Sequence, residues 1–371
     1  MVTIHRLVTA VAASAAIGVG LAHPGHTYQE LSREAELLKT AHENARRALV
    51  KYSDEPHVIA LKARAVERRA ATAQRLRAQR SLTKKNMFKR DEADILRYLN
   101  ISHDVTDKGY TLDTPHEVLF GTDQLAALAP ESDIGPYFAS GEFIRQDVTE
   151  DQAGIPVHLD MQFVDINTFE PMTDLLVDIW HCNATGVYSG VSASGQAGLN
   201  TTWLRGVGGS DDEGVVEFDT IFPGHYAGRA THIHIIATEN STILPNNTYI
   251  AGTTRHIGQL FFNDEIVNVV EAVEPYTSNT QSHLATANDT IAYSSASADY
   301  DPFVDYVLLG DSLSDGILMF ITVGINGTAD WSSTYRPAAH YGEDGGADTT
   351  FTYTPPGGFP TISTATAIAT A

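Results

Sequence analysis

The sequence predicts a mainly β protein, an antiparallel β-sandwich preceded by an α-helical hairpin. From about residue 112 onward, short apolar segments alternate with clusters of Gly, Pro, Asn and Asp, which is typical of an antiparallel sandwich. Every second residue of 157–163 is apolar, as in a strand buried on one face. Residues 27–83 instead carry apolar residues at spacings of three and four, which predicts two helices. We therefore expect a sandwich domain over residues 98–341, after a basic helical region at residues 23–97.

Residues 1–22 have the features of a secretory signal peptide. His5 and Arg6 precede an apolar run at residues 7–21, with small residues at the expected cleavage point. That run is too short to cross a bilayer, and no later run is long and apolar enough. The sequence therefore predicts a secreted, extracellular protein without a membrane segment.

The cysteine count and the glycosylation sequons give two further expectations. Cys182 is the single cysteine, so no internal disulfide forms, and we expect a buried free thiol. Asn-X-Ser/Thr sequons, the acceptors of N-linked glycans, predict a glycoprotein. They occur at Asn100, Asn183, Asn200, Asn240, Asn246, Asn288 and Asn326.

The helical region has only thin, Ala-rich apolar stripes. In its second half the stripe consists of Ile59, Ala63, Val66, Ala70 and Ala73, with Arg and Lys residues opposite. Such a stripe needs another surface to pack on. The region would therefore pack on another surface, such as a partner subunit. The alternative interpretation is that it is an autonomous basic linker.

After residues 157–163, the sequence predicts five more strands and a flexible end. The expected strands cover residues 175–180, 215–220, 231–237, 260–262 and 316–323. Residues 342–371, rich in Gly, Thr, Pro and Ala, are expected to form a flexible tail.

The chain is strongly acidic, with a formal net charge of −22. Such a surface binds nucleic acid poorly, so nucleic-acid partners are excluded. Few basic residues follow residue 97, and any of them near a site is therefore informative. They are Lys108, Arg145, Arg205, Arg229, Arg255 and Arg336.

Candidate metal ligands lie between residues 180 and 234. On a strand, the side chains of His232 and His234 project from one face, so both imidazoles can bind one ion. Tyr226 follows a Pro-Gly turn, and Tyr188 lies at the end of an apolar run. Imidazole suits several transition metals, whereas phenolate suits Fe(III). A carboxylate with the two histidines would instead predict an Fe(II) facial triad, but the candidates at residues 211–213 have the pattern of a turn.

The same residues carry a family resemblance. The pattern W-H-C-x-x-x-G-x-Y stands at residues 180–188, P-G-x-Y at 223–226 and R-x-x-H-I-H at 229–234. With these motifs the chain resembles the intradiol ring-cleavage dioxygenases, specifically their secreted fungal branch, over roughly residues 130–335. One departure is Asn183, where related sequences usually have Asp.

The resemblance implies an Fe(III) ion held by Tyr188, Tyr226, His232 and His234, with water or hydroxide as the fifth ligand. The substrates would be an ortho-diphenol and O2, and the product a cis,cis-muconate-type diacid. Tyr226 would leave the iron with a substrate proton, and Arg229 would stabilise developing negative charge. The N-terminal helices would form the interface of a homodimer.

Two other classes of function stay open. One is a non-catalytic secreted sandwich that serves as a binding module. The other is a copper monooxygenase that uses His23 as its N-terminal residue after cleavage of the signal peptide. Metal content and the visible spectrum distinguish these two classes from the iron dioxygenase.

The basic residues also predict substrate preference. A substrate carboxylate needs a cation besides Arg229, and Arg205 is the nearest candidate, in a Gly-rich segment expected to be mobile. We therefore expect neutral diols, such as catechol or hydroxyquinol, to be preferred over protocatechuate.

Overall fold

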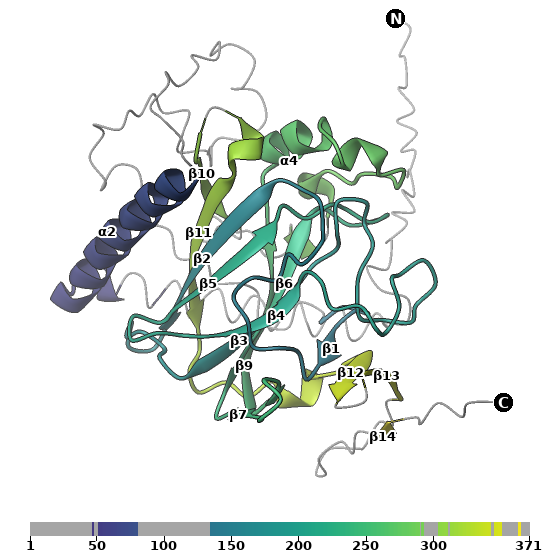
Figure 1. Cartoon of the computed structure of the whole chain (residues 1–371). Coiled ribbons are helices and arrows are strands. Elements are labelled where there is room, and N and C mark those ends of the chain that lie inside the picture. The colour runs from purple at the N-terminus through teal and green to yellow at the C-terminus, as the bar shows by residue number, and fades with distance from the viewer. Residues whose placement is uncertain are drawn as a thin grey trace, which may run out of the picture.

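The computed structural model describes residues 47, 51–80, 134–289, 291–292, 303–310, 312–342, 345–350 and 363–364. Two four-stranded sheets pack face to face, with helix α2 along one side (Figure 1). The predicted β-sandwich with an N-terminal helix is therefore confirmed. The first predicted helix of the hairpin, the signal segment, His23, Asn100 and Lys108 fall outside the described residues, apart from Arg47 and the residues at 51–52 of that helix.

The first sheet contains, in spatial order, β10 (Asp305–Leu308), β11 (Ile317–Ile325), β2 (Pro156–Asp165) and β5 (Val215–Ile221). The second contains β4 (Arg205–Gly209), β3 (Leu175–Trp180), β6 (His232–Glu239) and β9 (Thr253–Phe261). Every pair in the second sheet is antiparallel. In the first, β2 and β11 run parallel, which the long connection between them in the chain allows.

The remaining elements lie around the sandwich. A small sheet has the order β1 (Ala139–Ser140), β12 (Ala339–Gly342), β13 (Gly345–Thr350) and β14 (Ser363–Thr364), and β7 (Thr242–Ile243) pairs with β8 (Tyr249–Ile250). The helices are α2 (Pro56–Gln79), α4 (Asp264–Glu271) and the short η1 (Tyr276–Ser278), η2 (Thr286–Asn288), η3 (Leu313–Asp315) and η4 (Ser332–Thr334). Strand β13 lies in the segment for which the sequence predicted a flexible tail, and it is ordered by pairing with β12.

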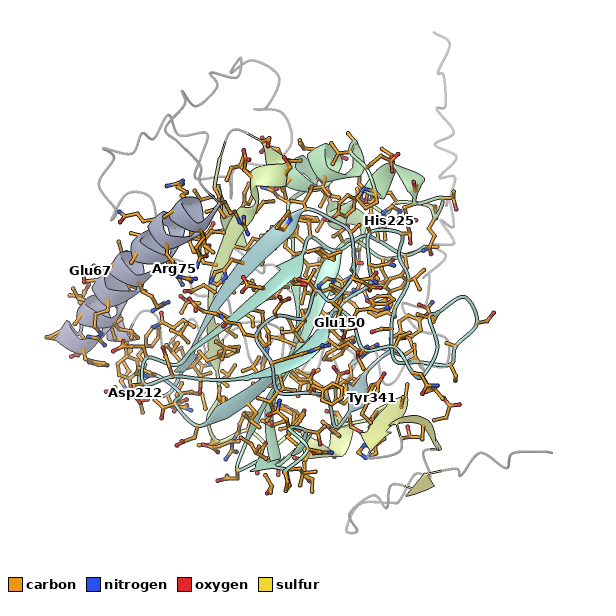
Figure 2. All side chains as sticks on the ribbon, viewed as in Figure 1. Glu67, Arg75, Glu150, Asp212, His225 and Tyr341 are labelled. Atoms are coloured by element: carbon orange, nitrogen blue, oxygen red, sulfur yellow. The ribbon has the colours of Figure 1, made fainter. Side chains whose placement is uncertain are left out.

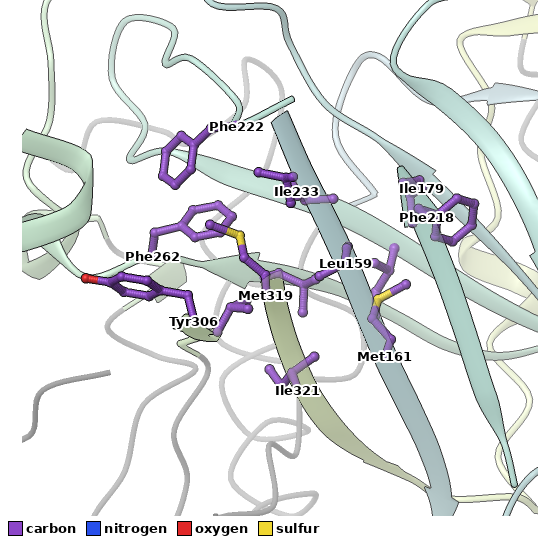
Figure 3. Close-up of a cluster of buried hydrophobic side chains, with 14 of the residues drawn as sticks. Leu159, Met161, Ile179, Phe218, Phe222, Ile233, Phe262, Tyr306, Met319 and Ile321 are labelled. Carbon is purple, nitrogen blue, oxygen red and sulfur yellow. The ribbon is translucent and has the colours of Figure 1, made fainter. Parts of the chain in front are cut away.

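The core fills the space between the two sheets. Leu159 and Met161 of β2, Ile179 of β3, Ile233 of β6 and Met319 of β11 are completely buried there (Figure 3). Because side chains alternate along a strand, this also determines which residues of β6 point away from the core. Because Ile233 points into the core, its neighbours on both sides point to the outer face of the second sheet.

Helix α2 covers the outer face of the first sheet. Its buried residues pack on β10 and β11, with Val66 and Ala70 against Leu318 and Phe320. The predicted stripe was partly wrong, since Ile59 is 55% exposed. The buried line instead runs through Val58, Leu61, Ala65, Val66, Arg69, Ala70, Thr72, Ala73 and Leu76. The surface that this stripe needs is thus supplied by the same chain.

The helix also changes the environment of β2. The sequence predicted a strand with one exposed polar face, but His158, Asp160 and Gln162 are all buried. Asp160 accepts hydrogen bonds from Arg68 at 3.0 Å and Arg69 at 3.3 Å, both on α2. Burial alone would raise the pKa of Asp160, but the two guanidinium groups outweigh it and lower that pKa. The polar face is therefore an ion-paired interface with α2.

Strand β4 corrects the expectation of a mobile Gly-rich segment. Its glycines allow close packing: a Cβ on Gly206 would lie 2.6 Å from Val148, and one on Gly208 would lie 2.6 Å from Val216. Residues 206–208 are buried or half-buried in the sheet. No helix in the described part of the chain has both the length and the apolar character needed to cross a membrane.

Candidate metal centre

The two histidines begin strand β6, a central strand of the second sheet. His234 pairs with Trp180 on β3 and with Gln259 on β9. The Nε2 atoms of His232 and His234 lie 3.1 Å apart, and both side chains are buried. The structure thus places both imidazoles on one face, as alternation along the strand predicted.

Neighbouring groups fix the orientation of both rings. The carbonyl oxygen of Ala230 lies 2.6 Å from Nδ1 of His232, so Nδ1 carries the proton and donates it. That tautomer leaves a lone pair on Nε2, the atom that faces His234. The indole of Trp180 stacks on the ring of His234, with 4.7 Å between centroids and 6° between planes.

Tyr188 lies in the loop between β3 and β4 and is completely buried. Gln196 fixes its backbone by accepting a hydrogen bond from the Tyr188 amide at 2.6 Å. The ring centroid lies 6.4 Å from that of His234. The hydroxyl has no hydrogen-bond partner among the described residues. Leaving a buried hydroxyl without a hydrogen-bond partner costs free energy. Such a missing partner is expected where the hydroxyl oxygen binds a metal ion instead.

The turn before Tyr188 is built by Asn183. Its Oδ1 accepts hydrogen bonds from the amide of Thr185 and the amide of Val187, both at 3.1 Å. Gly186 then adopts a φ of 79°, a conformation that favours glycine. Asn183, the residue that departs from the family pattern, therefore shapes the backbone turn that leads to Tyr188.

Tyr226 lies in the loop between β5 and β6 and is half-buried. Gly224, in the turn before it, packs so closely on the loop of Tyr188 that a Cβ would lie 2.6 Å from the carbonyl oxygen of Ala184. The ring centroid of Tyr226 is 5.8 Å from that of Tyr188 and 5.6 Å from that of His232. The four predicted ligands are thus brought together from three segments of the chain.

Both phenols resist ionisation in this environment. Burial raises the pKa of Tyr188 well above its ordinary value. Burial also raises the pKa of Tyr226, against the opposing effect of the Arg229 charge. A metal cation beside the two hydroxyls would reverse this balance and favour the phenolates.

Arg229 lies beside Tyr226 and is 2% exposed. Its Nη1 lies 3.5 Å from the Tyr226 hydroxyl, its Nε donates to Asp289 at 2.7 Å and its Nη2 donates to Gln259 at 2.5 Å. Burial alone would lower the pKa of Arg229, but the neighbouring Asp289 carboxylate and the Tyr226 oxygen outweigh it and raise that pKa. The guanidinium is therefore a fixed cation at the edge of the four-residue cluster.

Three residues of the site were not predicted from the sequence. Asp289 pairs with Arg229 and accepts hydrogen bonds from the backbone amides of residues 291 and 292. Gln259 is on β9, opposite His234. Tyr137 packs on Tyr188 with 4.6 Å between ring centroids. The only available signal was the Gly-Pro-Tyr sequence around residue 137, because the other two contacts join segments far apart in the chain.

The other histidines lie apart from the cluster. His225 turns away from Tyr226 and bonds Glu271 at 2.7 Å. His181 bonds Thr220 at 2.7 Å, and burial lowers its pKa to about 4. His158 lies in the first sheet, and His256 is buried on β9. These histidines therefore contribute to the fold and are not part of the candidate metal centre.

The carboxylates at residues 211–213 do not approach the two histidines. They form the predicted turn before Gly214, where Asp211 accepts hydrogen bonds from two backbone amides. Glu213 pairs with Arg64 of α2. Figure 2 shows Asp212 and His225 at opposite ends of the sandwich. A facial triad with these carboxylates is therefore excluded.

The donor set fits a trivalent iron. Over the described ranges, no group of three or more His, Cys, Asp or Glu side chains could hold a metal ion. The cluster at residues 188, 226, 232 and 234 is different in kind, because two of its four donors are phenol oxygens. Two imidazoles and two hard phenolate oxygens suit Fe(III) better than softer divalent ions. The single cysteine, Cys182, is buried and free, as predicted.

Comparisons with known proteins point to one family. Residues 134–301 match the family model described as Dioxygenase. An intradiol ring-cleavage dioxygenase from Tetranychus urticae is 28% identical, with 55% of this chain and 97% of that chain covered and a TM-score of 0.46. The dioxygenase domain of a carbohydrate-binding fusion protein from Streptomyces sp. SirexAA-E is 20% identical, with coverages of 54% and 97% and a TM-score of 0.33. Catechol 1,2-dioxygenase from Acinetobacter sp. ADP1 is 19% identical, with coverages of 56% and 65% and a TM-score of 0.36. No curated protein matches the chain.

Proposed function

We propose that the protein, whose residues 134–301 match the dioxygenase family model, is a secreted Fe(III) enzyme of the intradiol ring-cleavage class. It would cleave catechol-type ortho-diphenols with O2 between the two hydroxyl-bearing carbons. The prediction of the family and of the enzyme class is confirmed by the match. The observation that carries the proposal is the packing of two phenol rings and two imidazoles into one cluster.

In this proposal Tyr188, Tyr226, His232 and His234 hold the metal. Bound there, Fe(III) would withdraw electron density from a diphenolate and so prepare its ring for reaction with O2. Tyr188 is the permanent ligand, because it is completely buried and its hydroxyl has no hydrogen-bond partner among the described residues.

Tyr226 has the second role, that of a base. It is half-buried, so it is more accessible to a substrate than the completely buried Tyr188. Arg229 lies 3.5 Å from that oxygen and stabilises its anionic form. Tyr226 can therefore accept a proton from a substrate hydroxyl at its Oη atom.

Arg229 is held ready to stabilise charge on the substrate. Asp289 and Gln259 fix its Nε and Nη2, so Nη1 is the nitrogen left facing Tyr226. A cation fixed before the substrate binds does not need to reorganise during the reaction. Negative charge that develops on a substrate oxygen near Tyr226 is stabilised there.

The preferred substrates in this proposal are neutral diols. Arg145 and Arg205 are both occupied by carbonyl and carboxylate groups of the chain, as is Arg255. None of the three is free to bind a substrate carboxylate.

Secretion and assembly complete the proposal. Secretion rests on the signal-like sequence of residues 1–22 and the sequons, and amino-terminal sequencing of protein from culture medium tests it. A homodimer through the N-terminal helices is part of the proposal, although the apolar side of α2 packs on its own sheet.

The test is metal analysis with a visible spectrum. We expect about one iron per chain and a burgundy tyrosinate-to-iron band. Tyr188→Phe and Tyr226→Phe should each shift or bleach that band, and oxygen uptake with catechol should fall. Tyr52→Phe, on a tyrosine remote from the cluster, is the matched control. An unchanged spectrum in both site variants contradicts the ligand assignment. Stoichiometric copper, or a colourless protein after iron loading, supports one of the two alternative classes.

A further inference from the structure

Tyr188 and Tyr226 are on two different loops, and a third segment, residues 279–281, contacts both loops. We propose that Gln281 is a positioning residue that sets Tyr188 and Tyr226 at a fixed separation. This inference rests on the proposed function, because the separation matters if the two phenols hold one metal. No feature of the sequence motifs singles out Gln281.

The side chain of Gln281 joins the two loops directly. Its Nε2 donates to the carbonyl oxygen of Thr185 at 3.0 Å and to that of Gly186 at 3.2 Å. Its Oε1 accepts a hydrogen bond from the amide of Ala227 at 3.1 Å. One amide group thus binds the residues just before Tyr188 and the residue just after Tyr226.

The backbone around Gln281 is fixed as well. The carbonyl oxygen of Gln281 lies 3.0 Å from Nε2 of His225, whose Nδ1 contacts Glu271 of α4. Asn279 donates to the carbonyl oxygen of His225 at 2.8 Å and accepts from the amide of Gln281 at 3.1 Å. The bridge is therefore anchored to a helix and does not move freely with either loop.

The two loops also meet closely at this bridge. Gly186 has a φ of 79°, and a Cβ there would overlap Nε2 of Gln281 and the carbonyl oxygen of His225. The atoms at this contact between Gly186, Gln281 and His225 are so close that side chains cannot absorb a shift of the backbone. Small displacements of either loop are therefore transmitted to the tyrosine beside it.

The chemistry of the bridge needs an amide. Glutamate at position 281 would have nearly the same shape and could still accept from Ala227. It has no donor for the carbonyl oxygens of Thr185 and Gly186, and its charge would repel them. Gln281→Glu should therefore loosen mainly the loop of Tyr188, whereas Gln281→Ala should loosen both loops.

Hydrogen–deuterium exchange on the metal-free protein tests the bridge without any activity measurement. In Gln281→Ala we expect exchange to rise in peptides covering residues 183–188 and 224–227, by about tenfold for the Ala227 amide that loses its acceptor. The control is Gln152→Ala, which removes one contact to the first loop, from Asn183 at 3.2 Å, and none to the second. It should leave exchange in residues 224–227 unchanged.

Iron retention then tests what the bridge does for the site. With iron loaded, Gln281→Ala should release it to a chelator about tenfold faster than the wild type. Its charge-transfer band should also shift, while Gln152→Ala retains both properties of the wild type. The proposal is overturned if exchange in residues 224–227 is the same in Gln281→Ala and the wild type, or if exchange rises while iron release and spectrum do not change. A wild-type protein that binds no iron overturns the proposed function instead, and the exchange result alone then decides whether Gln281 joins the loops.

Discussion

Nη1 of Arg205 lies 3.1 Å from Oε1 of Glu142, and both side chains are almost completely buried. The same guanidinium donates to the carbonyl oxygen of Ser189 at 2.7 Å and to that of Tyr137 at 2.6 Å. Arg205 therefore supports the residue after Tyr188 and the aromatic residue that packs on it. Its charge and its donors are used inside the protein.

This relationship leads to a prediction about substrates. Protocatechuate carries a carboxylate that needs a cationic partner, and Arg205 cannot leave Glu142 without uncovering a buried charge. The acidic surface also slows the approach of an anion. We expect kcat/KM for catechol and hydroxyquinol to exceed that for protocatechuate, measured as oxygen uptake under one set of conditions. A higher value for protocatechuate would contradict the argument from charge.

A second prediction concerns the pair of Arg229 and Asp289. Asp289→Asn removes the charge that faces Nε of Arg229 at 2.7 Å but keeps the shape of the side chain. The guanidinium should lose its fixed direction, and kcat should fall by on the order of a hundredfold with a smaller change in KM. Steady-state kinetics with catechol measures both values. Asp264→Asn is the control, since Asp264 supports the same segment by accepting from the amide of Thr286 and does not pair with Arg229. Equal losses in the two variants would indicate a structural role.

Part of this site could be predicted because the relevant rules are local. Alternation along a strand places Ile233 in the core and His232 and His234 together on the opposite face. The Pro-Gly turn before Tyr226 is likewise visible in the sequence. These positions depend on neighbours in the chain.

The rest depends on contacts between distant segments. The polar face of β2 is buried because α2, about 90 residues earlier in the chain, supplies two arginines for Asp160. Strand β4 is ordered because Gly206 packs on Val148, although a Gly-rich segment by itself indicates mobility. Asp289 reaches Arg229 from 60 residues away. Composition and periodicity carry no information on such pairs.

A third prediction tests the attachment of α2. Asp160→Asn leaves Arg69, which is 1% exposed, without its carboxylate. Breaking a buried pair in this way costs about 3–5 kcal/mol in the free energy of unfolding, and urea titration measures it. Figure 2 shows Glu67 on α2, and this exposed residue provides the control variant Glu67→Gln. A loss no larger than that of the control would mean that the pair does not hold the helix.

A fourth prediction concerns the departure at residue 183. Asn183→Asp keeps the oxygen that accepts from Thr185 and Val187, and it loses only the Nδ2 contact to Gln152 at 3.2 Å. We expect stability and iron retention close to those of the wild type. Asn183→Ala removes the acceptor and should cost about 1–3 kcal/mol, with faster iron release. If Asp and Ala reduce iron retention equally, the turn is not what Asn183 contributes.

The fifth prediction is a pH dependence of stability caused by His158. Its Nδ1 lies 2.7 Å from Asp219, and its Nε2 lies 3.4 Å from Glu217. Burial alone would lower the pKa of His158, but the two carboxylates outweigh it and raise that pKa to about 9. The unfolded chain has a histidine pKa of about 6.5, so the stabilisation is fully present below that value and is lost as the pH rises through about 9. His158→Gln cannot titrate, and the wild type should therefore exceed it in unfolding free energy by more at pH 6 than at pH 9.5. Urea titrations of both proteins at the two pH values measure this difference, in which the other titrating groups cancel. A difference that does not change with pH would mean that His158 is neutral in the folded protein.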